Sequence, residues 1–134
     1  MPNTFQLEIV TPSRLLVKDA AEEAQIPGVT GYLGILPGHA PLITELGVGE
    51  ITYKASGAIH TLSVAWGFME VLPDKVTILA EAAERPHEID VERAQKAKDR
   101  AEQRLKSNDL QVDYTRAEDA LQRADTRLNV AKEK

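Results

Sequence analysis

Residues 51–64 read ITYKASGAIHTLSV. Two runs rich in apolar and β-branched residues, 51–55 and 59–64, flank Ser56-Gly57. A glycine at that place allows the tight turn that joins neighbouring strands, so the pattern predicts a β-hairpin. A second hairpin is predicted next along the chain, with strands at 68–72 and 76–79 around a turn at Pro73-Asp74.

The same pattern extends toward the N-terminus. Residues 5–9 alternate apolar and polar, Thr11-Pro12-Ser13 is a turn signal, and residues 15–17 form another short apolar run. Short strands with turn signals about every ten residues, and no long helical segment between them, are typical of a sandwich or barrel. We therefore expect an antiparallel β-sandwich in the first part of the chain.

The composition changes at Arg85-Pro86-His87. All eight glycines and all seven prolines precede residue 87. Residues 1–87 contain ten acidic residues and five Lys or Arg, whereas residues 88–134 contain eleven of each. We place a domain boundary here, with the β-sandwich over residues 1–86 and an α-helical unit over residues 87–134.

The second part has the periodicity of two helices. Spacings of three and four residues form one apolar stripe on each helix, and the members are Ala94, Ala97, Ala101 and Leu105, then Ala117, Leu121, Ala124, Leu128 and Ala131. Asp113 is the predicted N-cap of the second helix. Two helices joined by a short linker are expected to pack as an antiparallel hairpin. The predicted fold class is therefore mixed, an antiparallel β-sandwich followed by a two-helix hairpin.

The stripes consist largely of alanine. A methyl group buries little apolar surface, and burial stabilises by only roughly 25 cal/mol per Å². Helices of about 16 residues are marginal when isolated in water. The hairpin could therefore detach from the sandwich at modest cost, or it could stay docked permanently, and the sequence leaves both alternatives open.

Bulk properties exclude several classes of protein. The chain has no cysteine, which fits a reducing compartment, and its net charge of -5 argues against nucleic acid as the main partner. No stretch approaches the roughly 18 apolar residues of a membrane span, and the N-terminus lacks the pattern of a signal peptide. We expect a cytoplasmic protein with no inserted membrane segment.

The sequence predicts neither a catalytic residue nor a metal site. The glycine-rich residues 28–39 lack the Gly-Lys-Ser/Thr of a phosphate loop, and we interpret them as turns of the β domain. His39, His60 and His87 are too widely spaced for a local metal motif. A nucleotide-hydrolysing enzyme is therefore disfavoured, and an adaptor whose helices seek a partner coiled coil is a further alternative.

Several segments resemble one family. Residues 34–42, GILPGHAPL, are similar to the most characteristic segment of the epsilon subunits of F-type ATP synthases, and residues 67–71, GFMEV, follow as in that family. Asp113-Tyr114 and residues 127–131, RLNVA, are also similar. The resemblance extends over essentially the whole chain.

The resemblance implies a non-catalytic subunit of the rotor. Such a subunit binds the gamma subunit through its sandwich and rests on the ring of c subunits, and Tyr32 and His39 are then candidates for the ring contact. The hairpin would lie folded down on the sandwich or extend toward the alpha and beta subunits, where it obstructs ATP hydrolysis. The implied location is peripheral, on the cytoplasmic face of the bacterial plasma (inner) membrane.

The resemblance also implies a regulatory ATP site. Residues 89–94, IDVERA, match the Ile/Leu-Asp-x-x-Arg-Ala motif with which some epsilon subunits bind ATP. With the residues that accompany the motif, the implied site is Glu84, Ile89, Asp90, Arg93, Ala94, Arg100, Arg123 and Arg127. No obligatory cofactor is implied, and bound ATP would hold the hairpin down.

The spacing of the arginines supports this site independently. Arg93 and Arg100 share one helix face, Arg123 and Arg127 share another, and an antiparallel hairpin brings both faces together. Guanidinium groups suit phosphate oxygens. The alternative is ordinary surface pairing, such as Glu92 with Lys96 and Asp119 with Arg123 four residues apart.

Overall fold

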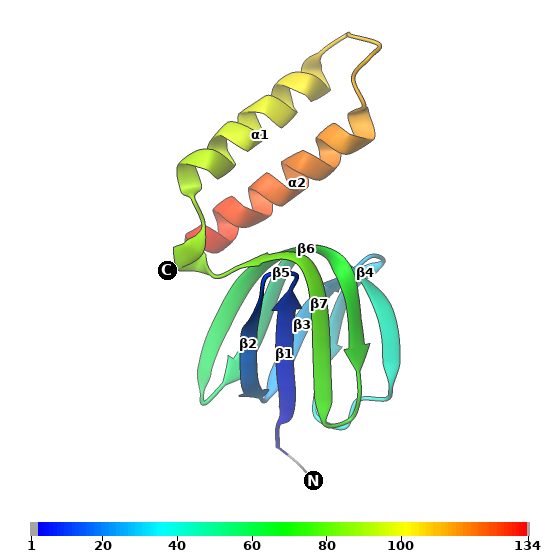
Figure 1. Ribbon diagram of the computed structural model, residues 1–134, viewed down its shortest axis with the longest axis vertical. Helices are drawn as coiled ribbons and strands as arrows, with labels where there is room; N and C mark the ends of the chain where they lie inside the picture. Colours follow the sequence, from blue (N-terminus) through cyan, green and yellow to red (C-terminus); the bar gives the residue numbers. More distant parts are fainter. Residues whose placement is uncertain (1–2, 134) are drawn as a thin grey trace.

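A computed structural model describes residues 3–133 and contains a seven-stranded sheet followed by two helices (Figure 1). The strands are β1 (Phe5–Thr11), β2 (Arg14–Ala21), β3 (Glu23–Gly28), β4 (Gly31–Ile35), β5 (Leu42–Ala55), β6 (Ala58–Val71) and β7 (Lys75–Glu84). A 3-10 turn, Pro86–Glu88, leads to α1 (Val91–Lys106) and α2 (Tyr114–Ala131). The predicted fold class, a β-sandwich followed by a two-helix hairpin, is confirmed.

The sheet has the strand order β2-β1-β7-β6-β5-β3-β4. Its neighbouring strands are antiparallel except for β1 and β7, which pair in parallel from Gln6 with Lys75 to Val10 with Leu79. The sheet also curls onto itself. The hydroxyl of Tyr53 on β5 donates a 2.7 Å hydrogen bond to Asp19 on β2, although these two strands are not neighbours in the sheet order. Two layers therefore enclose one core, as Figure 1 shows.

The core follows the alternation of the strands. Leu7 and Ile9 on β1 and Val76 and Ile78 on β7 are completely buried, and polar residues separate the members of each pair. Each buried side chain of this size stabilises the fold by roughly 1.5–3 kcal/mol relative to its exposure. The β-sandwich thus holds nearly all of the large apolar side chains that are buried.

The hairpin of β5 and β6 turns at Ser56-Gly57, as the sequence predicts. However, β6 is one continuous strand where the sequence predicts two, at 59–64 and 68–72. Trp66 (φ 58°) and Gly67 (φ 128°) have positive φ angles. They form an irregularity that bends the strand while pairing with β5 and β7 resumes on both sides.

The hairpin of β3 and β4 is absent from the sequence-based prediction, which interprets residues 28–39 as turns. Gly28 pairs with Gly31 across the end of this hairpin, and Ala24 pairs with Ile35 at its other end. A Cβ on Gly28 would lie 2.9 Å from the carbonyl oxygen of Gly31. Glycine here serves the close approach of two strand ends, so a glycine-rich segment still forms a strand pair.

The second helix begins at the predicted residue. Asp113 caps α2 by accepting a hydrogen bond from the N–H of Arg116, and Asp90 caps α1 in the same way from Arg93, both at 3.0 Å. Four alanines at the helix–helix contact are buried: Ala94, Ala101, Ala117 and Ala124. Lys98 on α1 and Asp125 on α2 form an ion pair of 3.1 Å across the hairpin.

Replacing Gly67 by alanine is expected to destabilise the sandwich by roughly 3 kcal/mol or more, because positive φ is strained and the new Cβ would overlap the carbonyl oxygen of Leu79. The matched control is Gly57→Ala. Gly57 also has positive φ (77°), but open space surrounds its Cβ position, so a cost of about 1–2 kcal/mol is expected. Urea unfolding measures both, and equal losses would contradict the overlap argument.

Candidate functional site

A cleft of about 450 Å³ lies between the helical hairpin and strands β6 and β7 of the sheet. Residues 63–65 of β6 and 82–84 of β7 form its floor, and α1 and α2 form its walls. Small residues on both sides, among them Ala82, Ala97 and Ala120, keep the space open. The alanine periodicity of the helices thus produces a cavity as well as a helix–helix contact.

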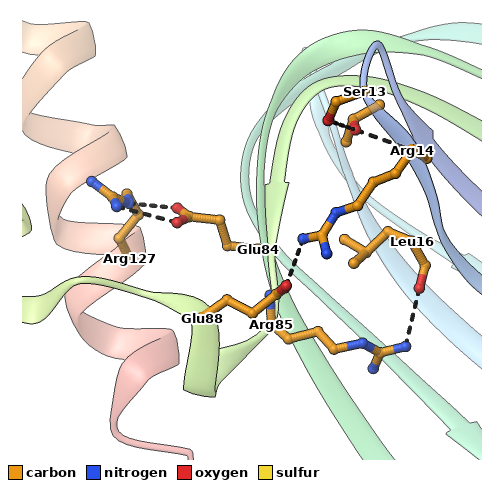
Figure 2. Close-up of polar contacts among 8 residues, drawn as sticks. Ser13, Arg14, Leu16, Glu84, Arg85, Glu88 and Arg127 are labelled. Carbon is orange, nitrogen blue, oxygen red and sulfur yellow. Dashed lines mark hydrogen bonds and ion pairs between the residues drawn. The ribbon is translucent and has the colours of Figure 1, made fainter.

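Glu84 and Arg127 join the floor of the cleft to its wall. Glu84 is the last residue of β7, and Arg127 lies in the last two turns of α2. The carboxylate accepts two hydrogen bonds from the guanidinium, at 2.6 and 3.2 Å, as Figure 2 shows. Both side chains are about three-quarters buried, with 24% and 30% exposure, so solvent weakens this pair less than an exposed one.

Three further predicted site residues line the same cleft. Arg93 and Arg100 project from α1 and Arg123 from α2. Within residues 3–133, Arg127 is the one arginine among these four that forms an ion pair. The cleft therefore has an excess of positive charge that a single carboxylate does not neutralise. Guanidinium groups in this arrangement can bind the oxygens of a polyanion.

Arg104 also lines the cleft, and the sequence-based prediction missed it. The signal was present in the spacing. Arg104 follows Arg100 by four residues and Arg93 by eleven, which places all three on one face of α1. Arg104 lies outside the family motif, but it lies on the helix face that carries Arg93 and Arg100.

The other three predicted site residues lie outside this cleft. Ile89 is buried against Val130 and Ala131 of α2, and Ala94 is buried in the contact between the helices. Asp90 borders a separate, open hollow with Arg93, Lys96 and Arg100. One carboxylate oxygen of Asp90 is engaged as the cap of α1. The structure thus brings together five of the eight residues, namely Glu84, Arg93, Arg100, Arg123 and Arg127.

Of the two surface ion pairs that the sequence suggests as an alternative, the structure contains one. Glu92 and Lys96 form an exposed ion pair of 3.3 Å. Asp119 and Arg123 form none within the part of the chain that the structure describes. Arg123 is thus left facing the cleft.

The structure does not bring Tyr32 and His39 together. Tyr32 is the second residue of β4, and its hydroxyl accepts a 3.0 Å hydrogen bond from the N–H of Glu50 on β5. His39 lies beyond the other end of β4, where a ring nitrogen is 2.7 Å from the carbonyl oxygen of Ala40. The two side chains therefore belong to opposite ends of one strand.

Neither a membrane-spanning helix nor a metal-binding cluster occurs among the described residues. No helix among residues 3–133 is long and apolar enough to cross a membrane. In the same residues, no group of three or more His, Asp or Glu side chains is placed to hold a metal ion.

Two protein-family models match the chain. Residues 4–86 match the β-sandwich domain of the ATP synthase delta/epsilon chain, and residues 87–132 match its long α-helix domain. Among solved structures, a chain of the Euglena gracilis mitochondrial ATP synthase has a TM-score of 0.83 at 24% identity. The match covers 98% of this chain and 83% of that one, and at this identity it shows a shared fold.

Curated relatives are similar over most of their length. The ATP synthase epsilon chain of Koribacter versatilis is 70% identical over 108 residues, which is 81% of this chain and 76% of the relative. The epsilon chain of Shouchella clausii is 50% identical over 131 residues, 98% of this chain and 97% of the relative. Together with the two family models, these relatives show that the chain belongs to the ATP synthase epsilon chain family.

Proposed function

We propose that this chain is the epsilon subunit of the ATP synthase central stalk, that it couples c-ring rotation to the catalytic head through gamma, and that its hairpin acts as an ATP-responsive brake on hydrolysis. The chain is a non-catalytic subunit of the complex. The observation that carries the regulatory part is the cleft, where several arginines face the sandwich and one carboxylate, Glu84, pairs with one of them.

The sandwich presents an apolar row that suits the gamma subunit. Leu15 pairs with Val10, Val10 with Leu79, and Leu79 with Phe68, so these residues form a row across four strands. Leu15, Leu79 and Phe68 are 53–56% exposed, and a hollow of about 420 Å³ lies beside them. Aromatic and aliphatic side chains exposed together mark protein interfaces. Glu45 and Glu81 border the row, which favours a partner surface with basic residues.

Tyr32 and His39 are the residues that we propose for the contact with the c-ring. Because Tyr32 lies near the start of β4 and His39 lies beyond its end, a contact made by both would require two surfaces of the sandwich. The loop of His39 approaches the turn between β6 and β7, since the N–H of Gly38 donates a 2.8 Å hydrogen bond to the carbonyl oxygen of Pro73. Leu36 and Ile43, on either side of this loop, are 60% and 72% exposed and would add apolar area.

The brake requires a hairpin that can leave the sandwich and reach the alpha and beta subunits. The hairpin is attached by the Glu84–Arg127 pair and by a 3.4 Å hydrogen bond from Gln122 to the carbonyl oxygen of Val48. A small apolar cluster of Ile89, Val130 and Ala131 lies within the base of the hairpin. That cluster is separate from the main core of the sandwich. Detachment would therefore leave the large apolar core intact, which supports a two-state hairpin.

ATP would favour the folded-down state because its site exists only there. The phosphates would bind Arg93, Arg100 and Arg123 from both helices, and the sandwich supplies the floor of the cleft. Asp90 has one carboxylate oxygen not used by its cap, and this oxygen suits the amino group of an adenine. A peripheral position on the cytoplasmic face of the bacterial plasma membrane follows from the stalk assignment.

Arg93→Ala is expected to weaken ATP binding to the isolated chain by roughly 10- to 100-fold, because one charge-assisted hydrogen bond is worth about 1.5–3 kcal/mol. Isothermal titration calorimetry measures the affinity. Arg116→Ala is the matched control, since Arg116 is an exposed arginine of α2 that does not line the cleft. Absence of wild-type binding at millimolar ATP would eliminate the sensor, and ATP turnover by the chain alone would favour the enzyme alternative.

Removal of residues 89–134 is expected to raise ATP hydrolysis by the assembled complex, because the brake is lost. Arg127→Ala in the full chain should have the opposite effect, since it frees the hairpin to extend. Steady-state hydrolysis at low ATP concentration measures both changes. Equal hydrolysis in all three complexes would show that the hairpin is not a brake in this protein.

Phe68→Glu is expected to reduce binding of gamma by an order of magnitude or more, because truncated aromatic anchors typically cost at least about 2 kcal/mol at an interface. Co-purification with gamma and surface plasmon resonance report the change. Leu110→Glu is the control, because Leu110 is 99% exposed at the tip of the hairpin, away from the row. Equal affinity of both variants would remove the row from the interface.

A further inference from the structure

The 3-10 turn Pro86–Glu88 lies between the two units, and three contacts fasten it to the sandwich side. A guanidinium nitrogen of Arg14, at the start of β2, is 2.6 Å from one carboxylate oxygen of Glu88. The other oxygen of Glu88 accepts a 2.9 Å hydrogen bond from the N–H of Arg85. The Arg85 side chain in turn donates to the carbonyl oxygen of Leu16 on β2 at 3.3 Å. Figure 2 shows these contacts on the sandwich side of the turn.

The next residue belongs to the hairpin. Ile89 is buried against Val130 and Ala131 of α2, and Asp90 caps α1. Between Glu88 and Ile89 the side-chain contacts therefore change from sandwich to hairpin, while the N–H of Ile89 still donates a 3.4 Å hydrogen bond to the carbonyl oxygen of Pro86 in the turn. Ile89 (φ −76°, ψ 125°) and Asp90 (φ −79°, ψ 98°) are both extended and follow the turn in the chain, so a change in the ψ angle of Ile89 or the φ angle of Asp90 leaves the contacts of Glu88 and Arg85 in place.

We infer that Arg14 is a positioning residue that fastens the turn to the sandwich through Glu88, so that the hairpin pivots at Ile89 and Asp90 and not at the domain boundary near residue 86. This inference rests on the proposed function only in that the hairpin must move. The clamp fixes where α1 departs from the sandwich and therefore the directions in which an extended hairpin can point.

The ionisation of Glu88 agrees with the clamp. Partial burial by itself would raise the pKa of Glu88. Hydrogen bonds from the Arg85 N–H and the Arg14 guanidinium, with the charges of Arg14 and His87, outweigh this effect and lower the pKa. Since the folded-state pKa is depressed, the clamp is fully formed above the ordinary pKa of a glutamate and is lost as the pH falls through the lowered value.

Spin-label distances in the full chain test the pivot, and the absence of native cysteine simplifies the labelling. One label at Asp74→Cys, in the turn before β7, is paired with a second label on the 3-10 turn (His87→Cys) or on α1 (Gln95→Cys); all three positions are exposed. When Arg127→Ala releases the hairpin, the 74–95 distribution should broaden and the 74–87 distribution should stay narrow. Broadening of both would overturn the inference.

A second variant keeps the test decisive if the hairpin stays docked. Arg14→Ala should broaden the 74–87 distribution, Arg14→Lys should restore it in part, and Lys18→Ala, an exposed cation on the same strand, should leave it narrow. A narrow 74–87 distribution in Arg14→Ala would overturn the clamp. An unchanged 74–95 distribution in Arg127→Ala would instead count against hairpin release in the proposed function.

Discussion

The ion pair between Glu84 and Arg127 joins the sandwich to the helical hairpin across the cleft, beside the hydrogen bond from Gln122 to Val48. Glu84 ends β7, which lies in the middle of the sheet, and Arg127 lies near the end of α2. The pair therefore helps to hold α2 over the sheet, and both of its residues line the cleft. It also determines the charge of the cleft, since one carboxylate removes the charge of one guanidinium and the others stay uncompensated.

The composition of the hairpin explains why polar contacts matter for its attachment to the sandwich. Its helices meet through alanine, and the large apolar side chains of the protein lie almost entirely in the sandwich. Among residues 3–133, only Ile89, Val130 and Ala131 form a second buried cluster, and it lies within the base of the hairpin. A three-residue cluster contributes a few kcal/mol at most. The contacts between hairpin and sandwich are therefore mainly polar, namely the Glu84–Arg127 pair and the hydrogen bond from Gln122 to Val48.

The sequence predicted the elements with strong local signals. The turn at Ser56-Gly57, both helices and the cap at Asp113 follow from local chemistry, and the structure has them. The strand pair β3–β4 was missed because its glycines serve close approach, which depends on the partner strand. The single long β6 was missed because an irregularity at Trp66 and Gly67 looks like a strand end in sequence.

In the candidate site, too, local spacing was predictable from the sequence and tertiary placement was not. Arg93, Arg100, Arg123 and Arg127 could be predicted to converge, because helical spacing and an antiparallel hairpin suffice. The pairing of Glu84 with Arg127 could not, because it depends on how the hairpin sits on the sheet. Asp90 and Ile89 match the family motif, yet their visible roles are a helix cap and a small apolar cluster.

The parallel pairing of β1 with β7 constrains the order in which the chain acquires its structure. β1 lies between β2 and β7, so its second neighbour is the last strand to leave the ribosome. The sheet cannot close until synthesis has passed Glu84, and non-local pairing of this kind is slow. The two helices need only each other and form locally. The unit with the least stabilising contact is therefore added to a sheet that is already complete, and a fault in the hairpin leaves the strand pairing of the sheet unchanged.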